Sequence, residues 1–505
     1  MPRYAAGLDF GTLSARALFV DVDTGETQTA EHTYRHGIIE DPSSPAVARQ
    51  DANDYLEAVE DLLSQAPEGV IGIGVAATAS TPIPVDADLR PLDGDLDAMA
   101  WLWKDHSAQA EAEEITALFA HHDPVRLARV GAYYAEWFWA KVLRCARNSP
   151  QASALAATWV EQCDFVTAHL TGNLRRGKCA AGHKALYCEG YPPTDTLANL
   201  HPELARIART LAEAASSSET AGGLSAEWGA KTGVPSGTPV AVGGVDAHLG
   251  AVGAGIWAGR VCMVLGTSAC HMAVAPYGIE SVPGISGIAD DSILPGMLGL
   301  EAGQAAFGDL FEWAAEQLGG SIEQLSADAA RAKPGCNGMI VLDFHSGNRC
   351  PLADARLAGV VLGQSLKTTR AESFRAVVEA AAFGIRQILE LLTVAGVPVT
   401  DLVACGGVAE KNDFVLQTIA DVTGRNVYRS ASGETVALGA AIFGAVVGGV
   451  FGSAEEGQSK LCKIDALPFT PSSEYNYTPI FEIWKQAQKE LGRDSTIIKQ
   501  LLDLP

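Results

Sequence analysis

Two similar segments that lie half a chain apart constrain the fold more than any other feature of this 505-residue sequence. In residues 4–22, two short apolar runs flank a polar tip that contains Gly11-Thr12, and the turn residues 23–26 follow. Apolar runs bounded by turn residues are typical of a β-hairpin. Residues 261–268 repeat the first run and its tip, with Gly266-Thr267 in the place of Gly11-Thr12. The repeat predicts a protein built from two related halves.

The tip of the first hairpin gathers groups that suit a phosphate ligand. A carboxylate, a glycine turn, two hydroxyls and a cation stand together there, at Asp9, Gly11, Thr12, Ser14 and Arg16. A glycine lets backbone N–H groups approach a phosphate, hydroxyls add donors, and an aspartate can hold a hydrated magnesium ion. In the second copy Val264 replaces Asp9, so only the first copy can hold a metal at this position. The alternative is that D-F-G-T is a tight turn without a ligand.

Composition limits the class of protein and its partners. Apolar residues make up 48% and charged residues 19% of the chain, as in a globular protein of roughly two to four domains. The formal net charge of -24 argues against nucleic acid and against an anionic membrane surface, and it favours a small-molecule substrate. Ten cysteines without C-x-x-C pairs, and an N-terminus without a long apolar core, predict a cytoplasmic protein with reduced thiols.

Local patterns predict the main elements. Residues 70–77 form a glycine-studded buried strand that ends in a polar cluster, Thr78, Ser80 and Thr81. Apolar residues at three-and-four spacing predict helices at 51–63 and 370–393. Residues 435–449 are mostly small and apolar and carry no charge, so we expect a buried helix there.

Three further kinds of segment leave their role open. Two aromatic clusters, residues 101–106 at the start of a helix and residues 136–141, belong either to the core or to a sugar-binding surface. Residues 175–184 are a basic stretch in an acidic protein, either a site or a solvated loop. Residues 212–223, rich in serine and glycine, predict a surface loop.

Two glycine-rich strand ends are candidate sites. After Pro239 a buried strand ends at Gly243-Gly244 and delivers Asp246, whose carboxylate is either functional or a helix N-cap. Residues 401–405 lead into Gly406-Gly407 and then an amphipathic segment. Paired glycines between a strand and a helix let a flat ring or a phosphate lie against the backbone.

These motifs, in this order, resemble the FGGY family of carbohydrate kinases over nearly the whole chain. The shared motifs are D-F-G-T-L-S-A-R at 9–16, G-G-V-D-A-H at 243–248, G-T-S at 266–268 and G-G-V-A-E-K-N at 406–412. The pieces between them resemble the ribulokinase branch of that family: A-T-A-S-T-P at 77–82, W-K-D-H at 103–106, E-W-F-W-A-K at 136–141, A-G-H-K at 181–184 and G-L-E-A-G-Q at 299–304. Each motif is weak alone, and the ordered set is specific.

The resemblance implies an α/β fold of two actin-like ATPase (ribonuclease H-like) domains with an interdomain active-site cleft. Each domain would contain a five-stranded mixed sheet. Residues 1–254 would form the sugar-binding domain, and residues 255–505 the ATP-binding domain. The chain is somewhat shorter than typical ribulokinases, which leaves a homodimer as an open alternative for the assembly state.

The resemblance also implies roles for residues at matching positions. Asp246 would be the catalytic base and would hold Mg²⁺ together with Asp9. ATP would be contacted by Gly11, Thr12, Ser14, Arg16, Gly266, Thr267, Gly406, Gly407 and Asn412. The sugar would be contacted by Ala79, Trp103, Lys184, Asp246 and Glu301.

The implied activity is phosphorylation of a ketopentose by ATP with Mg²⁺, L-ribulose to L-ribulose 5-phosphate in L-arabinose catabolism. Residues 79–81 read Ala-Ser-Thr where glycerol kinases carry Arg-Glu and xylulokinases Gln-Met-His, which disfavours both relatives. A kinase for D-ribulose or a pentitol is the alternative within the family. An actin-like chaperone or filament protein would not need the Trp103, Lys184 and Glu301 set, and a silent sugar sensor would not need both Asp9 and Asp246.

Overall fold

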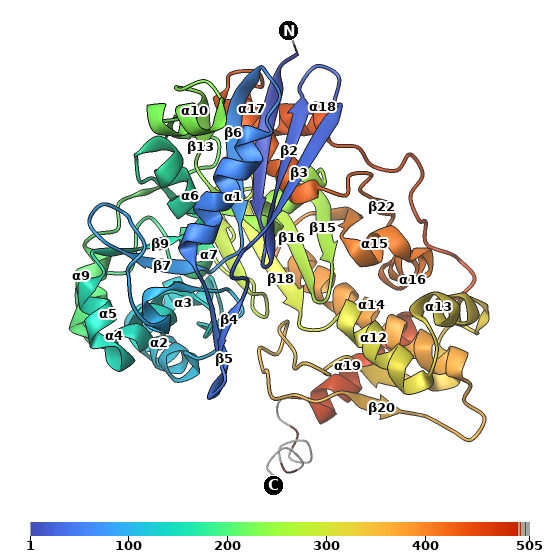
Figure 1. Cartoon of the computed structure of the whole chain (residues 1–505). Helices are drawn as coiled ribbons and strands as arrows, with labels where there is room; N and C mark the ends of the chain where they lie inside the picture. Colours follow the sequence, from blue (N-terminus) through green and yellow to red (C-terminus); the bar gives the residue numbers. More distant parts are fainter. Residues whose placement is uncertain (1, 493–494, 496–499, 501–505) are drawn as a thin grey trace.

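Two mixed β-sheets dominate the computed structural model, which describes residues 2–492, 495 and 500 (Figure 1). The seven-stranded first sheet has the order β12 (Thr220–Gly223), β13 (Pro239–Ala241), β6 (Val70–Ala77), β1 (Tyr4–Phe10), β2 (Ser14–Asp21) and β3 (Thr27–Thr33), with β14 (Gly244–Val245) also paired to β6. The six-stranded second sheet has the order β17 (Gly287–Asp290), β18 (Leu298–Gln304), β16 (Ala269–Ala275), β15 (Gly259–Leu265), β21 (Val399–Cys405) and β22 (Val427–Arg429). Both sheets are wider than the five strands that the resemblance implied.

The two sheets share one pattern of pairing, which confirms the predicted repeat. β1 pairs antiparallel with β2 and parallel with β6, and β15 pairs in the same way with β16 and β21. Beyond these strands, β3 and β18 extend the antiparallel side, while β13 and β22 extend the parallel side. The strand predicted at 70–77 is β6. Each half therefore presents a hairpin tip and a parallel strand end at the same edge of its sheet.

Helices cover both sheets, and the two predicted from apolar spacing are α1 (Ala52–Ser64) and α14 (Arg370–Val394). The other helices and small sheets have the following bounds: α2 (Gln109–His122), α3 (Pro124–Ala128), α4 (Phe138–Asn148), α5 (Pro150–Leu155), α6 (Gln162–Thr171), α8 (Thr194–Ala198), α9 (Pro202–Ala208), α10 (Ala226–Thr232), α12 (Gly308–Leu318), α13 (Ile322–Arg331), α15 (Gly407–Lys411), α16 (Asp413–Thr423), α18 (Ala454–Leu461), α19 (Thr478–Leu491), β4 (Ile39–Asp41), β5 (Ser44–Gln50), β7 (Pro82–Val85), β9 (Thr158–Glu161), β19 (Ile340–Leu342) and β20 (Val360–Leu362). Among the described residues, no helix is both long and apolar enough to span a membrane.

The uncharged helix α17 (Thr435–Val447) joins the two halves, and its burial confirms the prediction. It comes from the second half of the chain, yet it packs on β1 and β6 of the first sheet and on α11 (Asp246–Gly253). Glycines permit this approach, because a Cβ at Gly7 or Gly74 would lie 1.8 Å from a carbonyl oxygen of α17. One apolar cluster contains side chains from both sheets, α11 and α17. The two halves therefore share a core.

One predicted loop, one loop alternative and one predicted helix start are wrong in part. Residues 175–184 form β10 (Arg176–Gly177) and α7 (Lys178–Lys184), not a solvated loop. The guanidinium of Arg176 is buried because it donates to the Trp159 carbonyl and the Thr158 hydroxyl. The predicted loop at 212–223 contains β11 (Ala214–Ala215) and the edge strand β12. Trp101 ends the short strand β8 (Ala100–Trp101) and residues 102–106 form a turn, so the next α-helix begins only at Gln109.

Candidate active site

A cavity of about 270 Å³ lies between the two sheets and is lined from both halves of the chain. It contains the predicted sugar residues Ala79, Trp103, Lys184, Asp246 and Glu301, together with Gly266 and Thr267 of the second hairpin tip. Of the two aromatic clusters, most rings are in the core, but Trp103 is 38% exposed and faces this cavity. The structure thus brings the candidate base, the candidate sugar residues and one phosphate loop to a single place.

Asp246 stands at the point where strand β14 turns into helix α11. Val245 occupies the N-cap position, and Asp246 is the first helical residue, so the N-cap alternative for this carboxylate is wrong. Its Oδ1 accepts a hydrogen bond of 2.6 Å from the Ala247 N–H. Burial raises the pKa of Asp246, which makes its carboxylate a stronger base than an exposed one.

Asp9 lies near the end of β1, and its carboxyl group is electrostatically coupled to that of Asp246. Burial first, and then the charge of Asp246, raise the pKa of Asp9 to about 8. No hydrogen bond to this carboxylate comes from any residue that the structure describes. A divalent cation would offset the repulsion between two such carboxylates, and carboxylate oxygens are ligands that Mg²⁺ accepts. The pair therefore fits a magnesium ion.

Thr12 at the first hairpin tip lies outside the cavity lining and contacts Trp103, which is part of it. The Trp103 indole N–H donates to the Thr12 hydroxyl over 3.0 Å, and the Gln50 amide donates to the Thr12 carbonyl over 2.6 Å. Ser14 and Arg16 both contact the Glu31 carboxylate. Neither residue lines the cavity.

The glycine N–H groups of both tips are committed to the hairpins themselves. Gly11 N–H donates to the Ser14 carbonyl and Gly266 N–H to the Ser268 carbonyl, each over 3.0 Å. The second tip is also fixed to the start of α12, because Gly308 N–H donates to the Gly266 carbonyl over 2.9 Å. These two glycine N–H groups are therefore not free to bind a phosphate in this structure.

The segment 406–412 lies beside the second hairpin and outside the cavity lining. Gly406 has a φ of +91°, and a Cβ there would lie 2.7 Å from the Leu265 carbonyl, so a side chain is excluded. A Cβ at Gly407 would meet nothing within 4 Å, which leaves room for a ligand over the backbone. The Asn412 side chain caps α16 and donates to the Ser326 hydroxyl over 2.8 Å. Asn412 is thus held in place by the fold.

Lys184 and Glu301 form an ion pair across the cavity wall. The ammonium lies 3.0 Å from Oε2 and 3.3 Å from Oε1 of Glu301, and it lies over the Trp137 ring at 5.4 Å. Although burial opposes it, Lys184 holds the pKa of Glu301 well below its usual range. An ionised carboxylate beside an ammonium offers both acceptors and donors, as the hydroxyls of a sugar require.

A buried lysine fixes the two loops that carry Ala79 and Trp103. Lys141 Nζ donates to the carbonyls of Ser80 at 2.8 Å, Leu102 at 2.9 Å and Trp101 at 3.3 Å. Three acceptors satisfy all three ammonium donors. The lysine of the E-W-F-W-A-K motif therefore has a positioning role, and burial lowers its pKa to about 8.

Sequence reasoning missed several residues of the cavity. Tyr134, Glu136, Trp137, Ser286 and Arg349 line it as well. Glu136 and Trp137 belong to the E-W-F-W-A-K motif, which the resemblance included without a role for either residue. Arg349 lies in a loop between β19 and β20, and no local pattern distinguished it.

Known proteins of one carbohydrate kinase family are similar to this chain over its whole length. The family model described as "FGGY family of carbohydrate kinases, N-terminal domain" matches residues 4–253, and the C-terminal domain model of the same family matches residues 261–447. A ribulokinase from Shouchella clausii is 36% identical over 100% of this chain and 98% of its own length. A ribulokinase from Bacillus licheniformis is 37% identical over 97% of each chain.

Solved structures agree on the fold. A xylulose kinase from Rhodospirillum rubrum superposes with a TM-score of 0.82 at 23% identity, covering 99% of this chain and 100% of its own. A gluconate kinase from Lactobacillus acidophilus has a TM-score of 0.83 at 19% identity, covering 98% and 99%. At such identities these structures show the fold alone, and they confirm the predicted two-domain, actin-like α/β architecture. With both family models and full-length relatives above 30% identity, the chain belongs to the FGGY family of carbohydrate kinases, which are phosphotransferases that act on an alcohol group.

Proposed function

We propose that this protein uses ATP to phosphorylate L-ribulose to L-ribulose 5-phosphate. One juxtaposition carries the proposal: Lys184 and Glu301, which suit sugar hydroxyls, line the same cavity as Asp246 and the Gly266-Thr267 tip. Full-length similarity to ribulokinases supports a pentulose as the acceptor. A kinase for D-ribulose or a pentitol would use the same groups with a different stereochemical preference.

The proposed chemistry assigns a proton transfer to Asp246. Its carboxylate accepts the proton of the sugar hydroxyl as that oxygen bonds to the γ-phosphorus of ATP and the bond to ADP breaks. Thr12 and Thr267 donate hydrogen bonds to phosphate oxygens. When bound, Mg²⁺ offsets the negative charge of the β- and γ-phosphates. Asp9 and Asp246 are the residues that would hold it, a fit supported by their coupled carboxyl groups.

A substrate panel tests the acceptor. We expect L-ribulose to give the highest kcat/KM when ADP release is measured with L-ribulose, D-ribulose, ribitol, D-xylulose and glycerol, with D-ribulose or ribitol next. A clear preference for glycerol or D-xylulose would refute the assignment.

Two isosteric variants test the roles of the carboxylates. Asp246→Asn should lower kcat by roughly 10²-fold or more, in the range of general-base catalysis, while the affinity for sugar changes far less. Added Mg²⁺ should not restore this variant. Asp9→Asn should instead raise the Mg²⁺ concentration needed for activity. If Asp246→Asn keeps its fold and near-normal turnover, another residue must be the base.

Three coarser expectations belong to the same proposal. The boundary near residues 254–255, with sugar bound by the first part and ATP by the second, stays a prediction. The cytoplasmic location rests on ten cysteines that are all unpaired. The homodimer stays a prediction, for which sedimentation velocity is the direct measurement.

A further inference from the structure

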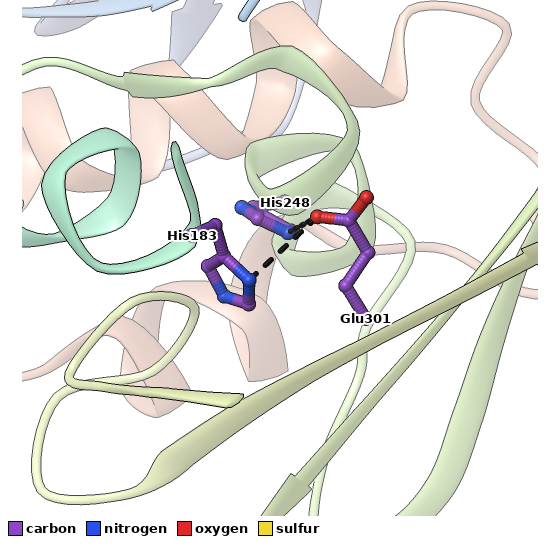
Figure 2. A group of neighbouring side chains, drawn as sticks. All are labelled: His183, His248 and Glu301. Carbon is purple, nitrogen blue, oxygen red and sulfur yellow. Dashed lines mark ion pairs between the residues drawn. The ribbon is translucent and has the colours of Figure 1, made fainter. Parts of the chain in front are cut away.

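Two buried histidines meet the Glu301 carboxylate at the back of the cavity wall (Figure 2). His183 lies in α7, His248 in α11 and Glu301 in β18, so three distant segments converge here. His248 Nε2 is 3.2 Å from Glu301 Oε2, and His183 Nδ1 is 3.7 Å from the same oxygen. The two rings lie 4.4 Å apart, and the exposed fraction of each histidine is 1% or less.

His183 Nδ1 and His248 Nε2, the two nitrogens that face the carboxylate, are both buried. His248 Nε2 forms an ion pair with Glu301, whereas His183 Nδ1 has no hydrogen-bond partner in the part of the chain that the structure describes. An unpaired polar atom in the interior destabilises a fold, so His183 Nδ1 needs an explanation. The common direction of the two nitrogens, toward Glu301 Oε2, indicates that a ligand belongs between them.

The outer nitrogens show which form of the His183 ring is present. The Ser292 hydroxyl donates to the Ala289 carbonyl over 3.0 Å, so its oxygen accepts from His183 Nε2–H at 3.1 Å. In the neutral ring Nδ1 then carries a lone pair, and that lone pair faces a carboxylate oxygen. Two electron-rich atoms aimed at each other are stabilised by a cation placed between them.

His248 is held from behind in a similar way. Its Nδ1 lies 3.0 Å from Cys179 Sγ, and that sulfur also accepts the Val245 N–H at 3.3 Å. Ligating histidines almost always bond through their second nitrogen to an outer partner, which fixes the orientation of the ring. Ser292 and Cys179 occupy that outer position for the two rings.

We propose that His183, His248 and Glu301 form a binding site for Zn²⁺. Zinc bonds to nitrogen and oxygen of about 2.0–2.2 Å place neighbouring tetrahedral ligands about 3.3–3.6 Å apart. The distances of 3.2 and 3.7 Å match this spacing, and all three ligand atoms lie within 4.8 Å of one another. Two imidazoles favour zinc over Mg²⁺ and Ca²⁺, which prefer oxygen. Two histidines and one glutamate also form a known zinc ligand set that leaves a fourth position open.

Occupancy of this site would change the cavity. Glu301 Oε2 is also the nearest partner of the Lys184 ammonium, at 3.0 Å. A zinc ion on that oxygen repels the ammonium and removes the carboxylate from hydrogen bonding with a ligand in the cavity. Zn²⁺ and sugar would therefore compete, a consequence that rests on the proposed function, whereas the binding of zinc itself does not.

Direct binding to the metal-free protein tests the site. We expect one Zn²⁺ per chain in competition with a chromophoric chelator, and with Co²⁺ the intense visible absorption of tetrahedral coordination. His183→Gln and Glu301→Gln each remove a zinc ligand and should weaken zinc binding by about 100-fold or more. Ser292→Ala removes only an outer partner of His183 and should weaken it by roughly 10- to 100-fold. The control His121→Gln/His122→Gln changes two neighbouring histidines of α2 and should leave the affinity unchanged.

Ser292→Ala keeps all three ligands, so it provides the test where a ligand variant does not fold. The proposal is overturned if no stoichiometric zinc binds, or if His183→Gln and Ser292→Ala bind it as tightly as the unaltered chain. Saturating L-ribulose should weaken zinc binding, and zinc should weaken sugar binding by the same factor. Stoichiometric zinc binding that L-ribulose leaves unchanged would overturn the competition and the proposed sugar position, but not the metal site.

Discussion

Replacing Gly253 by Ala should impair catalysis from a position far along helix α11 from the candidate base. α11 begins at Asp246 and packs against α17 backbone to backbone. A Cβ at Gly253 would lie 1.9 Å from the Thr435 carbonyl oxygen, and real contacts of this kind are essentially never under 3.0 Å. The two helices must therefore separate by more than about 1 Å, and the shift passes along α11 to its first residue.

The magnitude follows from two opposing effects. Overpacking of a tight interface destabilises by about 1–3 kcal/mol. Ala in place of Gly in a helix returns about 1 kcal/mol. We expect Gly253→Ala to lose roughly 0–2 kcal/mol of stability. A displacement of about 1 Å at a reacting group can lower the rate by about 10²-fold, so kcat should fall by 10- to 100-fold.

Gly250→Ala is the matched control in the same helix, one turn nearer to Asp246. Its Cβ would meet the Val436 Cγ2 methyl at 3.2 Å, and a partly exposed side chain can move by the few tenths of an ångström needed. This variant should be as stable as the unaltered protein or slightly more so, with near-normal kcat. Urea unfolding and steady-state kinetics on both variants decide the matter. Equal effects of the two substitutions would show that the α11–α17 contact does not position the base.

Three further outcomes are expected. The pKa of Asp9 is about 8 in the folded protein and about 3.8 in the unfolded chain. Ionisation of Asp9 therefore lowers the free energy of unfolding progressively as the pH rises from about 4 to 8. Metal-free Asp9→Asn should therefore gain stability over the unaltered protein across that range in urea titrations, and a constant difference would contradict the shift. Lys141→Met leaves three buried carbonyls without a donor, so we expect a loss of at least about 1–3 kcal/mol and a higher sugar KM. Sugar plus a non-hydrolysable ATP analogue should reduce the radius of gyration in solution scattering, and an unchanged profile would count against closure of the cleft.

Most elements could be predicted because their signals are local. The hairpin around Gly11, strand β6 and helix α14 each show their own period of apolar residues, and the structure has them at or near the predicted positions. The repeat of the hairpin at Gly266 was also readable, since a pattern of strand, Gly-Thr tip and strand recurs in one sequence. Period and turn residues are sufficient where one face of an element is buried.

The segments that were misread depend on distant partners. Arg176 is buried by acceptors in β9, and Lys184 by Glu301, more than a hundred residues further along the chain. A local reading of charge predicts solvent exposure for both residues. Arg349 could not be found for the same reason, because its place in the cavity depends on where the loop before β20 meets β16 and β18. The histidines that contact Glu301, His183 and His248, lie in two of the recognised motifs, but their meeting with Glu301 depends on the tertiary fold.

The two halves are joined by several contacts and differ at the tips of their hairpins. The contacts include α17 against the first sheet, at Gly7 and Gly74, and α7 against β17, beside which Lys178 pairs with Asp291 over 2.7 Å. Asp9 exists only in the first hairpin, and its counterpart Val264 cannot carry a metal or a proton. The carboxylate of Asp9 therefore has no counterpart in the second hairpin, whose tip shares the cavity with Asp246.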